Sequence, residues 1–386
     1  MLGCELNSEK FEISIFERNA TLGRKFLVAG DGGLNLTHSE NEISFIKKYT
    51  PFSFLEKSFQ SFSNHTFIKW LNGLGIPTFI GSSGRVFPKK GIKPAEVLNL
   101  FLKKIKTNSV NINTKYKWQG FSNNNHLIFN HNNDLIKIKS DYFIFCLGGA
   151  SWPITGSKGD WIDYFEEKHI NTLPFKASNC AFQINWHPEL IQKIEGKALK
   201  NISITCNKKT NYGEIVITRF GLEGSGIYPL SAQIRQQLDE VKNATVYIDF
   251  KPDFSLEKII EKIESIADKK NFTTNLKIKL NLSQLQIQLL KACLSKQDFT
   301  DVNKLSVNIK KFKLTIINTA TIEESISTVG GISLNEINEN FELKKLPGHF
   351  VIGEMLDYDA PTGGYLLQSC FSMAKYLAHY LNNKID

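Results

Sequence analysis

The chain has 386 residues, of which 41% are hydrophobic and 22% charged, and its formal net charge at pH 7 is +9. This length allows two or three domains with packed cores, and the composition is that of a soluble globular protein. A run of about 18 apolar residues is missing, which argues against a membrane span. The opening MLGCELNSEK lacks the basic and apolar stretches of a signal peptide.

The positive charge is spread along the chain rather than gathered into one block. Proteins that bind nucleic acid usually concentrate basic residues on one face. Nucleic acid is therefore not expected as a partner, although the charge also suits an anionic cofactor. Nothing in the sequence indicates the oligomeric state.

The six cysteines and eight histidines lie far apart, without a CxxC pair or a histidine at metal-ligand spacing. We expect no metal site, and free thiols fit a reducing, cytoplasmic compartment. A Ser-His-Asp or Cys-His arrangement does not stand out, so the catalytic residues are unknown at this stage. A bound organic cofactor would then supply the chemistry.

Residues 11–17 alternate apolar and polar side chains and end at Glu17, which predicts a β-strand. An acidic residue at the end of the second strand of a dinucleotide-binding fold accepts hydrogen bonds from a ribose hydroxyl. Glu17 is therefore a candidate ribose ligand. The alternative is an ordinary surface glutamate at a strand end.

A glycine-rich loop spans residues 23–40. Its glycines permit positive φ and close approach of a ligand to the backbone, and its basic pair can neutralise a pyrophosphate. Its amide and hydroxyl side chains could hydrogen-bond a flavin. The candidate residues are Arg24, Lys25, Gly30, Gly32, Gly33, Asn35 and Thr37. A glycine-rich turn with a flanking basic pair is the alternative.

Residues 44–76 have helical apolar spacing, and a second amphipathic helix is predicted to start at Pro94. Residues 108–140 alternate and turn, as hairpins do. The apolar run 141–153 is typical of a strand that is buried on both faces of a parallel sheet. It ends in Gly148-Gly149, which indicates either a second cofactor-binding glycine motif or a tight strand-to-helix connection.

The middle of the chain has a different pattern. Residues 172–250 are rich in β-strand signals, and Ser255 is predicted to cap a helix with one apolar face. A further helix is predicted over 283–295 and a strand over 312–317. The β-rich and helical middle thus separates two segments of mixed α/β character.

The end of the chain carries the strongest signal. A short apolar strand at 350–352 leads into an acidic turn, and paired glycines then begin a long amphipathic helix. Unpaired N–H groups at the positive end of a helix bind phosphates or the electron-rich edge of a cofactor ring. The candidate residues are Gly353, Glu354, Asp357, Gly363, Gly364 and Tyr365.

We predict a discontinuous nucleotide-binding domain formed by 1–171 and 318–386, which the family resemblance described next implies to be an FAD-binding domain. An inserted β-rich domain would comprise 172–250 and 305–317, and a small helical lobe would comprise 251–304. The predicted fold class is α/β, with a Rossmann-like cofactor domain and an insert.

Five motifs, in this order and spacing, resemble the BaiN-like NAD(P)/FAD-dependent oxidoreductases, also called HI0933-like or aminoacetone-oxidase-like flavoproteins. They are GRKFLVAGDGGLNLTHSE, SSGRVFP, CLGGASWPITGSKGD, GEIVITRFGLEGSGIYPLS and FVIGEMLDYDAPTGGYLLQSCFS. The resemblance runs from about residue 11 to the C-terminus and is specific for the family but not for a substrate. It implies an FAD domain of the two-dinucleotide-binding type, a β-barrel-like insert and a small helical lobe.

The resemblance also implies residue roles. Glu17 would hold the adenosine ribose, and the basic pair and glycine loop would face the pyrophosphate and flavin. Asp357 would bond the phosphate–ribityl region. The helix after Gly364 would direct its dipole toward the isoalloxazine.

The chain departs from the family at its start. The family opens with a strand, a GxGxxG turn and a helix, whereas Glu17 comes too early here for those elements. MLGCELNS resembles the end of that first helix. We therefore expect the first strand and its glycines upstream of Met1, behind a mis-set or truncated start. The alternative is a remnant with impaired FAD binding.

The sequence thus predicts an enzyme in which NAD(P)H passes a hydride to FAD, and the flavin reduces an unidentified organic acceptor. An alternative is a flavin-linked protein that modifies or associates with RNA, prompted by the charge of +9. The substrate, the choice between NADH and NADPH, and the proton donor are open from the sequence.

Overall fold

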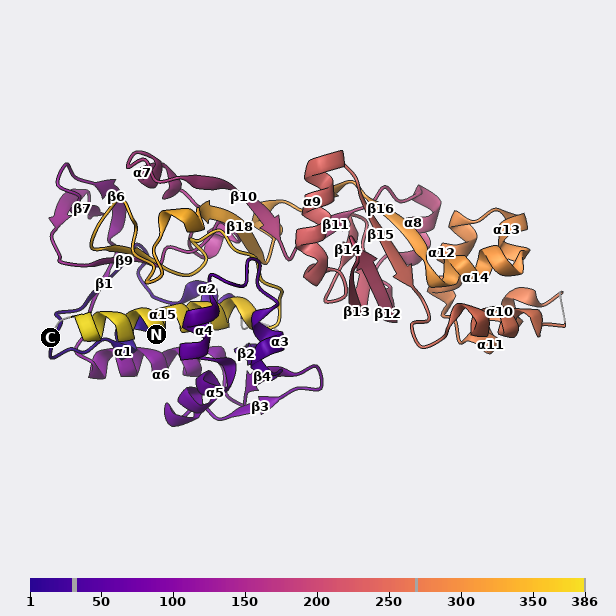
Figure 1. Cartoon of the computed structure of the whole chain (residues 1–386), viewed down its shortest axis with the longest axis horizontal. Helices are drawn as coiled ribbons and strands as arrows, with labels where there is room; N and C mark the ends of the chain where they lie inside the picture. Colours follow the sequence, from indigo (N-terminus) through magenta and orange to yellow (C-terminus); the bar gives the residue numbers. More distant parts are fainter. Residues whose placement is uncertain (30–32, 268–269, 385–386) are drawn as a thin grey trace. The chain divides into compact units, whose positions relative to one another are not determined.

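The protein is described by a computed structural model (Figure 1). The structure describes residues 1–29, 33–267 and 270–384. The chain divides into two compact units. Unit 1 comprises Met1–Lys176 and Ile326–Asp386, and unit 2 comprises Ala177–Ser325.

Unit 1 contains two pairs of parallel strands. Strand β1 (Ser14–Glu17) pairs with β5 (Asn111–Thr114), and β9 (Phe143–Phe145) pairs with β19 (His349–Val351). Parallel strands need crossover connections, and the connection from β1 to β5 contains the helices that lie between residues 24 and 107. This βα arrangement confirms the predicted α/β class with a Rossmann-type domain.

Helix α15 (Tyr365–Lys384) is the longest helix of unit 1, and it lies beside α1 and α4 (Figure 1). Its buried face includes Met373, Leu377 and Leu381 at helical spacing, so its apolar stripe closes the core of the unit. The other helices of unit 1 are α1 (Leu2–Glu5), α2 (Arg24–Ala29), α3 (Glu42–Ile46), α4 (Glu56–Ser61), α5 (Asn64–Gly73), α6 (Pro94–Thr107), α7 (Ile162–Glu166) and the 3-10 turns η1 (Pro153–Thr155) and η4 (Leu334–Glu336).

Three smaller sheets complete unit 1. One has the order β2-β4-β3, one is the meander β6-β7-β8, and β10 pairs with β18. Their bounds are β2 (Thr37–His38), β3 (Thr78–Ile80), β4 (Arg85–Pro88), β6 (Lys117–Phe121), β7 (Leu127–His131), β8 (Asp134–Ile138), β10 (Thr172–Ser178) and β18 (Ser327–Ile332). The meander confirms the hairpins predicted within 108–140.

Unit 2 is built on a seven-stranded sheet with the order β16-β15-β12-β13-β14-β11-β17. Its strands are β11 (Phe182–Gln183), β12 (Ala198–Cys206), β13 (Lys209–Ile217), β14 (Gly221–Glu223), β15 (Ala244–Asp249), β16 (Phe312–Ile316) and β17 (Asn318–Thr319). Alternate residues of β15 and β16 are buried in a core separate from that of unit 1. The pairing of β11 with β17 brings the two ends of unit 2 together.

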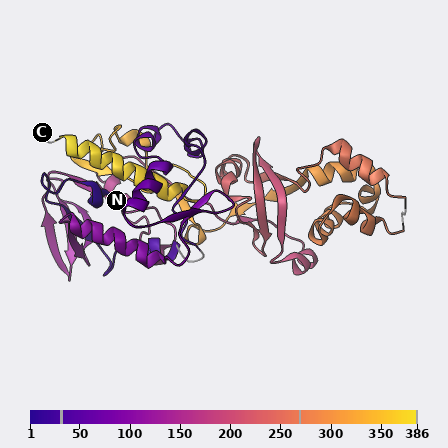
Figure 2. The same ribbon diagram turned by 90° about the horizontal axis from the view of Figure 1, so that it is seen from below.

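Helices α10 to α14 of unit 2 form one group, drawn in orange in Figure 2. The helices of unit 2 are α8 (Pro188–Ile194), α9 (Ser231–Val241), α10 (Leu256–Glu264), α11 (Phe272–Leu280), α12 (Gln284–Cys293), α13 (Lys296–Thr300), α14 (Val302–Lys310) and the 3-10 turns η2 (Tyr228–Leu230) and η3 (Ile322–Glu324). Ser255 caps α10 as predicted. The prediction for 172–250 missed α9, because this largely polar helix buries little more than Ile234 on its inner face.

Candidate functional site

Three segments of unit 1 meet at the ammonium group of Lys25. Lys25 stands in the first turn of α2, where its Nζ donates to Ser151 Oγ at 2.9 Å and to Glu354 Oε2 at 3.2 Å. Ser151 follows β9 and Glu354 follows β19, so the adjacent ends of two parallel strands supply both acceptors. The predicted residues Lys25 and Glu354 are thus brought together. The Lys25 side chain remains 39% exposed, which leaves this cation accessible to a ligand.

The glycines at the same strand ends differ in their surroundings. Gly148 and Gly353 have φ of 78° and 80°, and the nearest atoms to a Cβ built on them are 3.8 and 3.5 Å away. A Cβ on Gly149 would instead lie 2.3 Å from Thr328 Oγ1. Gly148 and Gly353 therefore leave open space beside left-handed backbone, whereas Gly149 allows close packing within the protein.

Asp357 is fixed by the backbone of the neighbouring strand. Its Oδ1 accepts a hydrogen bond from the Gly330 N–H at 2.9 Å, and its own N–H donates to the Ile332 carbonyl at 3.0 Å. Asp357 thus lies at the end of β18 and belongs to the same region as Glu354, in a turn that β19 leads into.

A second group of predicted residues surrounds the N-terminus of α15. Thr37 Oγ1 donates to Gln368 Oε1 at 2.8 Å, and a Cβ on Gly364 would lie 2.5 Å from the Thr37 Cα. Gly364 therefore makes room for the Thr37 backbone. Gly363 is more open, with Arg85 Nε 3.5 Å from the position of a Cβ and φ of 110°.

Asn35 and Arg85 have unsatisfied polar groups beside this helix end. Asn35 Nδ2 donates to the Thr37 and Val86 carbonyls, but its buried Oδ1 has no hydrogen-bond partner among the described residues. The half-buried Arg85 guanidinium forms no ion pair with any described residue. A buried acceptor with no donor among the described residues is a candidate contact for a ligand, and the nearby Arg85 is a candidate contact for an anion.

Tyr365 is the first residue of α15, and its hydroxyl donates to Glu40 Oε1. Burial, together with this hydrogen bond and the Glu40 charge, raises the pKa of the Tyr365 phenol far above its ordinary value. Its ring stacks on His38 with centroids 5.6 Å apart. Tyr365 is therefore a neutral donor that holds Glu40.

Glu17 and Arg24 form a third, smaller group. Glu17 Oε1 accepts from the Asn19 N–H at 2.7 Å and from Asn19 Nδ2 at 2.8 Å, while Arg24 Nη1 donates to Asn19 Oδ1 at 3.3 Å. Asn19 thus links the two predicted residues after β1. Gly30 and Gly32 lie outside the described residues, and Gly33, the first described residue after them, has φ of 125°.

Cys370 lies beneath Gly353, where a Cβ would approach its Sγ to 3.5 Å. Burial, with the negative charge of Glu354, raises the pKa of the Cys370 thiol to about 12. It therefore stays a neutral thiol at physiological pH. Across the described residues, His, Cys, Asp and Glu side chains form no group of three or more that could hold a metal ion.

Several site residues escaped the sequence reasoning, namely Glu40, Arg85, Ser151, Thr328 and Gln368. Four of them lie within motifs that were recognised. Glu40 ends the glycine loop, Arg85 belongs to SSGRVFP, Ser151 follows the second glycine pair and Gln368 belongs to the C-terminal motif. Their polar chemistry was a usable signal. Which partner each one meets depends on tertiary structure.

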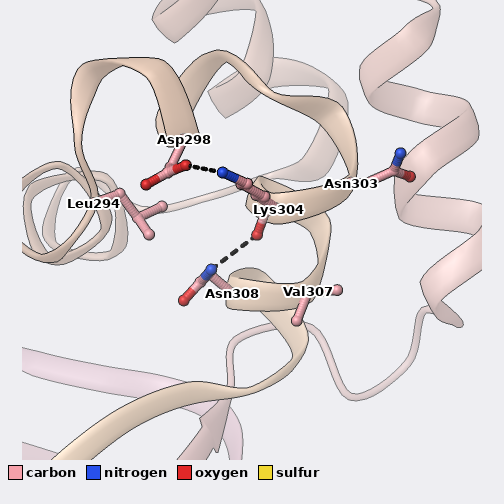
Figure 3. A pocket seen from close by; sticks show the side chains of 6 residues that line it. All are labelled: Leu294, Asp298, Asn303, Lys304, Val307 and Asn308. Carbon is pink, nitrogen blue, oxygen red and sulfur yellow. Dashed lines mark hydrogen bonds and ion pairs between the residues drawn. The ribbon is translucent and has the colours of Figure 1, made fainter.

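Unit 2 contains a separate cleft of about 390 Å³ in its helical part. Figure 3 shows the Asp298–Lys304 ion pair at one side of it and Asn308 bonded to the Lys304 carbonyl. The lining residues are Leu294, Asp298, Asn303, Lys304, Val307 and Asn308. None of the residues predicted for the cofactor site lines this cleft.

Parallel strands that end in open glycines, next to a helix N-terminus, define unit 1 as a Rossmann-type nucleotide-binding unit. A family model described as the HI0933-like protein Rossmann domain matches residues 1–380. The chain belongs to this family, which confirms the resemblance found in the sequence. It is thereby a flavin-dependent oxidoreductase by class. None of the described helices is long and apolar enough to cross a membrane.

Two curated relatives are similar over much of the chain. Ribosomal RNA dihydrouridine synthase of Escherichia coli is 22% identical over 363 residues, which cover 91% of this chain and 87% of that protein. The 3-dehydro-bile acid delta(4,6)-reductase of Clostridium scindens is 23% identical over 269 residues, 68% of this chain and 64% of that protein. Among solved structures, 3-ketosteroid-delta4-(5alpha)-dehydrogenase from Rhodococcus jostii has a TM-score of 0.48 at 10% identity, covering 98% of this chain and 94% of that one.

Proposed function

We propose that this protein takes a hydride from NAD(P)H onto FAD and passes it to an organic acceptor in the cytoplasm. The observation that carries the proposal is the meeting of Lys25, Ser151 and Glu354 beside the open glycines of two parallel strand ends. Crevices at the carboxyl ends of such strands are the usual sites for dinucleotides. The division of the chain into an FAD domain, a β-rich insert and a helical lobe belongs to the same proposal.

The residues of unit 1 fit FAD chemically. The orphaned Asn35 Oδ1 is an acceptor for the imide N–H of a flavin ring, and Arg85 is a counter-charge for an anionic ring edge or phosphate. The open, positive-φ glycines Gly33, Gly148, Gly353 and Gly363 offer backbone that a flat ring or phosphate can approach. FAD, when bound, supplies a ring that accepts a hydride and returns it.

The protein's own groups have distinct proposed tasks. Lys25 keeps a positive charge at the site, and Glu354 and Ser151 orient its ammonium group. The N-terminus of α15 adds partial positive charge beside Gly363. Asn19 donates to Oε1 of Glu17, and the other carboxylate oxygen, Oε2, would accept a hydrogen bond from a ribose hydroxyl. Together these groups favour negative charge where a reduced ring would carry it.

We propose a carbon–carbon double bond conjugated to a carbonyl as the acceptor. A delta(4,6)-reductase and a synthase of dihydrouridine both have names that denote the saturation of double bonds. In such a reaction a hydride adds to the β-carbon and a proton to the α-carbon, while NAD(P)H becomes NAD(P)⁺. Lys25 is a donor that could polarise the carbonyl oxygen.

Flavin content tests the proposal. The 386-residue protein is purified, denatured and assayed for released FAD. We expect FAD, with bleaching of its visible absorbance by NADH or NADPH under anaerobic conditions. A colourless protein that takes up no FAD on incubation would refute the proposal.

A second candidate is the reduction of a base in RNA. It is favoured by the similarity to the ribosomal RNA dihydrouridine synthase, which extends over 91% of this chain, and by the net charge of +9. Against it, the ammonium groups of Lys251, Lys262 and Lys310 in unit 2 donate to backbone carbonyls of their own unit. Binding of ribosomal RNA that persists at about 150 mM salt would support this candidate. Binding that disappears with salt would leave the small-molecule acceptor.

A further inference from the structure

We propose that Leu27, Val28, Trp152 and Ile154 form an apolar platform for the flat ring of the acceptor, whose carbonyl oxygen points to Lys25. This inference rests on the proposed function and names the substrate class of the same site. The acceptor would be a planar, conjugated ring compound with a carbonyl group. The four residues are called the Trp152 platform below.

The four platform residues are exposed and lie close in sequence to Lys25 or Ser151. Leu27 and Val28 on α2 are 36% and 40% exposed, Trp152 is 42% exposed and Ile154 is 81% exposed. Helix α2 packs against η1, and the Lys25–Ser151 hydrogen bond joins the two segments at 2.9 Å. Clustered exposed apolar side chains beside polar groups are typical of ligand sites.

Packing fixes the direction in which α2 presents these residues. Phe26 packs edge-on against Phe101 with ring centroids 6.0 Å apart, and a Cβ on Gly23 would collide with Leu98. The helix is thus held against α6 by its Gly23–Phe26 side. Leu27 and Val28 are left exposed by that anchoring, in the turn that follows Lys25.

Trp152 has a backbone conformation that bulky residues rarely adopt. Its φ and ψ are 51° and 62°, in the left-handed region. The conformation is held by two hydrogen bonds to the Trp152 carbonyl, from the Thr155 N–H at 3.0 Å and Thr155 Oγ1 at 2.8 Å. Strain that the surroundings enforce is characteristic of functional positions. Here the left-handed residue directly follows Ser151, which accepts from Lys25.

The polar half of the site would select the carbonyl. Lys25 and Ser151 are neighbours of the platform in sequence, two residues before Leu27 and one before Trp152. A carbonyl oxygen bound by the Lys25 ammonium group would withdraw electrons from the conjugated double bond and make its β-carbon more electrophilic. The indole face would stack on the ring, which sets the plane of approach.

Calorimetric binding of chromone, a flat fused ring with a conjugated carbonyl, tests the platform. Naphthalene, a flat ring without a carbonyl, is the second probe, and both are titrated into the protein as purified. We expect W152A to weaken chromone binding about tenfold and W152F to stay within about threefold of the parent. Leu135→Ala, at another exposed apolar position of unit 1, is the matched control and should bind chromone normally.

The two probes also separate the two halves of the site. W152A should weaken both probes, whereas Lys25→Met should weaken chromone alone. Unaltered chromone binding by W152A, or no measurable binding by the parent, would overturn the platform. A loss of FAD from W152A would also overturn it, because the indole would then be holding the cofactor.

Failure of the inference can be told from failure of the proposed function. Suppose that the protein is yellow and reduces ferricyanide with NAD(P)H, but that W152A binds chromone as tightly as the parent. This result would contradict the platform alone. A colourless protein that still binds chromone through Trp152 would contradict the proposed function alone.

Discussion

Gly363 and Gly364 are consecutive residues that would tolerate a side chain to different degrees. Both have positive φ, of 110° and 94°. A side chain on Gly364 would enter the backbone of Thr37, whereas a side chain on Gly363 would meet only side-chain atoms at 3.5 Å. Gly364 thus maintains the fold, and Gly363 leaves a surface open.

We expect Gly364→Ala to destabilise unit 1 by about 3 kcal/mol or more, because steric overlap adds to the cost of the left-handed backbone. Gly363→Ala should destabilise unit 1 by about 1–2 kcal/mol, because only the cost of placing alanine in left-handed backbone applies there. Urea unfolding of the apo-proteins measures the difference. Equal losses for the two variants would show that Thr37 can move away from α15.

Glu336 is a buried carboxylate whose partners determine its ionisation. Burial alone would raise its pKa, but hydrogen bonds from Lys345 and Asn171 outweigh burial, and the net pKa lies below the ordinary value. Lys345 Nζ approaches Oε2 at 3.0 Å and Asn171 Nδ2 approaches Oε1 at 2.5 Å. A depressed pKa means that this contribution to stability is present above the unfolded-state pKa and is lost as pH falls through the folded-state value.

We therefore expect the protein to lose stability as pH falls below about 4.3, the unfolded-state pKa of glutamate. Glu336→Gln should lower stability at pH 7 by about 1–2 kcal/mol, because Lys345 is partly exposed and keeps water as a partner. The variant should also lose less stability than the parent between pH 5 and pH 3. Parallel pH dependences in urea titrations would contradict this account.

Helix α15 shows how one element fixes several parts of the site. Its Gln368 is fully buried, accepts from Thr37 and donates to the Phe62 carbonyl at 3.1 Å and to Ser372 at 3.0 Å. Tyr49 donates to the Tyr365 carbonyl at 2.7 Å. The helix therefore holds Thr37 of the glycine-rich segment, together with Tyr49 and Phe62, through buried hydrogen bonds.

We expect Gln368→Leu to cost about 2 kcal/mol, because the buried Thr37 hydroxyl loses its acceptor. Hydrogen exchange at residues 33–40 should then accelerate. Asn383→Leu, at an exposed position of the same helix, is the control and should change neither quantity by much. Unchanged protection of 33–40 would mean that Gln368 does not order the glycine-rich segment.

At the level of elements, the sequence predicted what depends on local pattern. The helix from Pro94, the strand leading to Gly353 and the long final helix all carry strong periodic or capping signals. Local pattern could not reveal that Arg85 would lie beside Gly363, or that Glu40 would bind Tyr365, because those contacts join distant segments. It also could not separate Gly149, which packs on Thr328, from the open Gly148.

Over the whole molecule, unit 2 has the properties of an inserted domain. Its two ends meet through β11 and β17, where the Ala320 N–H donates to the Ala181 carbonyl at 2.8 Å. Its buried side chains form a core of their own. In unit 1, β10 pairs with β18, so the chain leaves and re-enters that unit on adjacent strands.

We expect residues 177–325 to fold alone, with a cooperative thermal transition and dispersed amide NMR signals. A unit 1 in which a short Gly-Ser loop joins Lys176 to Ile326 should also fold, because the loop replaces an insertion between adjacent strands. A molten 177–325 fragment would show that its core needs unit 1.

The pairing of β9 with β19 has a consequence for biosynthesis. The ribosome makes β9 before unit 2. It makes β19 and α15 only after all of unit 2 has been synthesised. Unit 2 can therefore fold on the ribosome while unit 1 still lacks a strand and its longest helix. A nascent chain that has not yet reached α15 would expose the unfilled core of unit 1 to chaperones and proteases, and could acquire its cofactor only after α15 has been made.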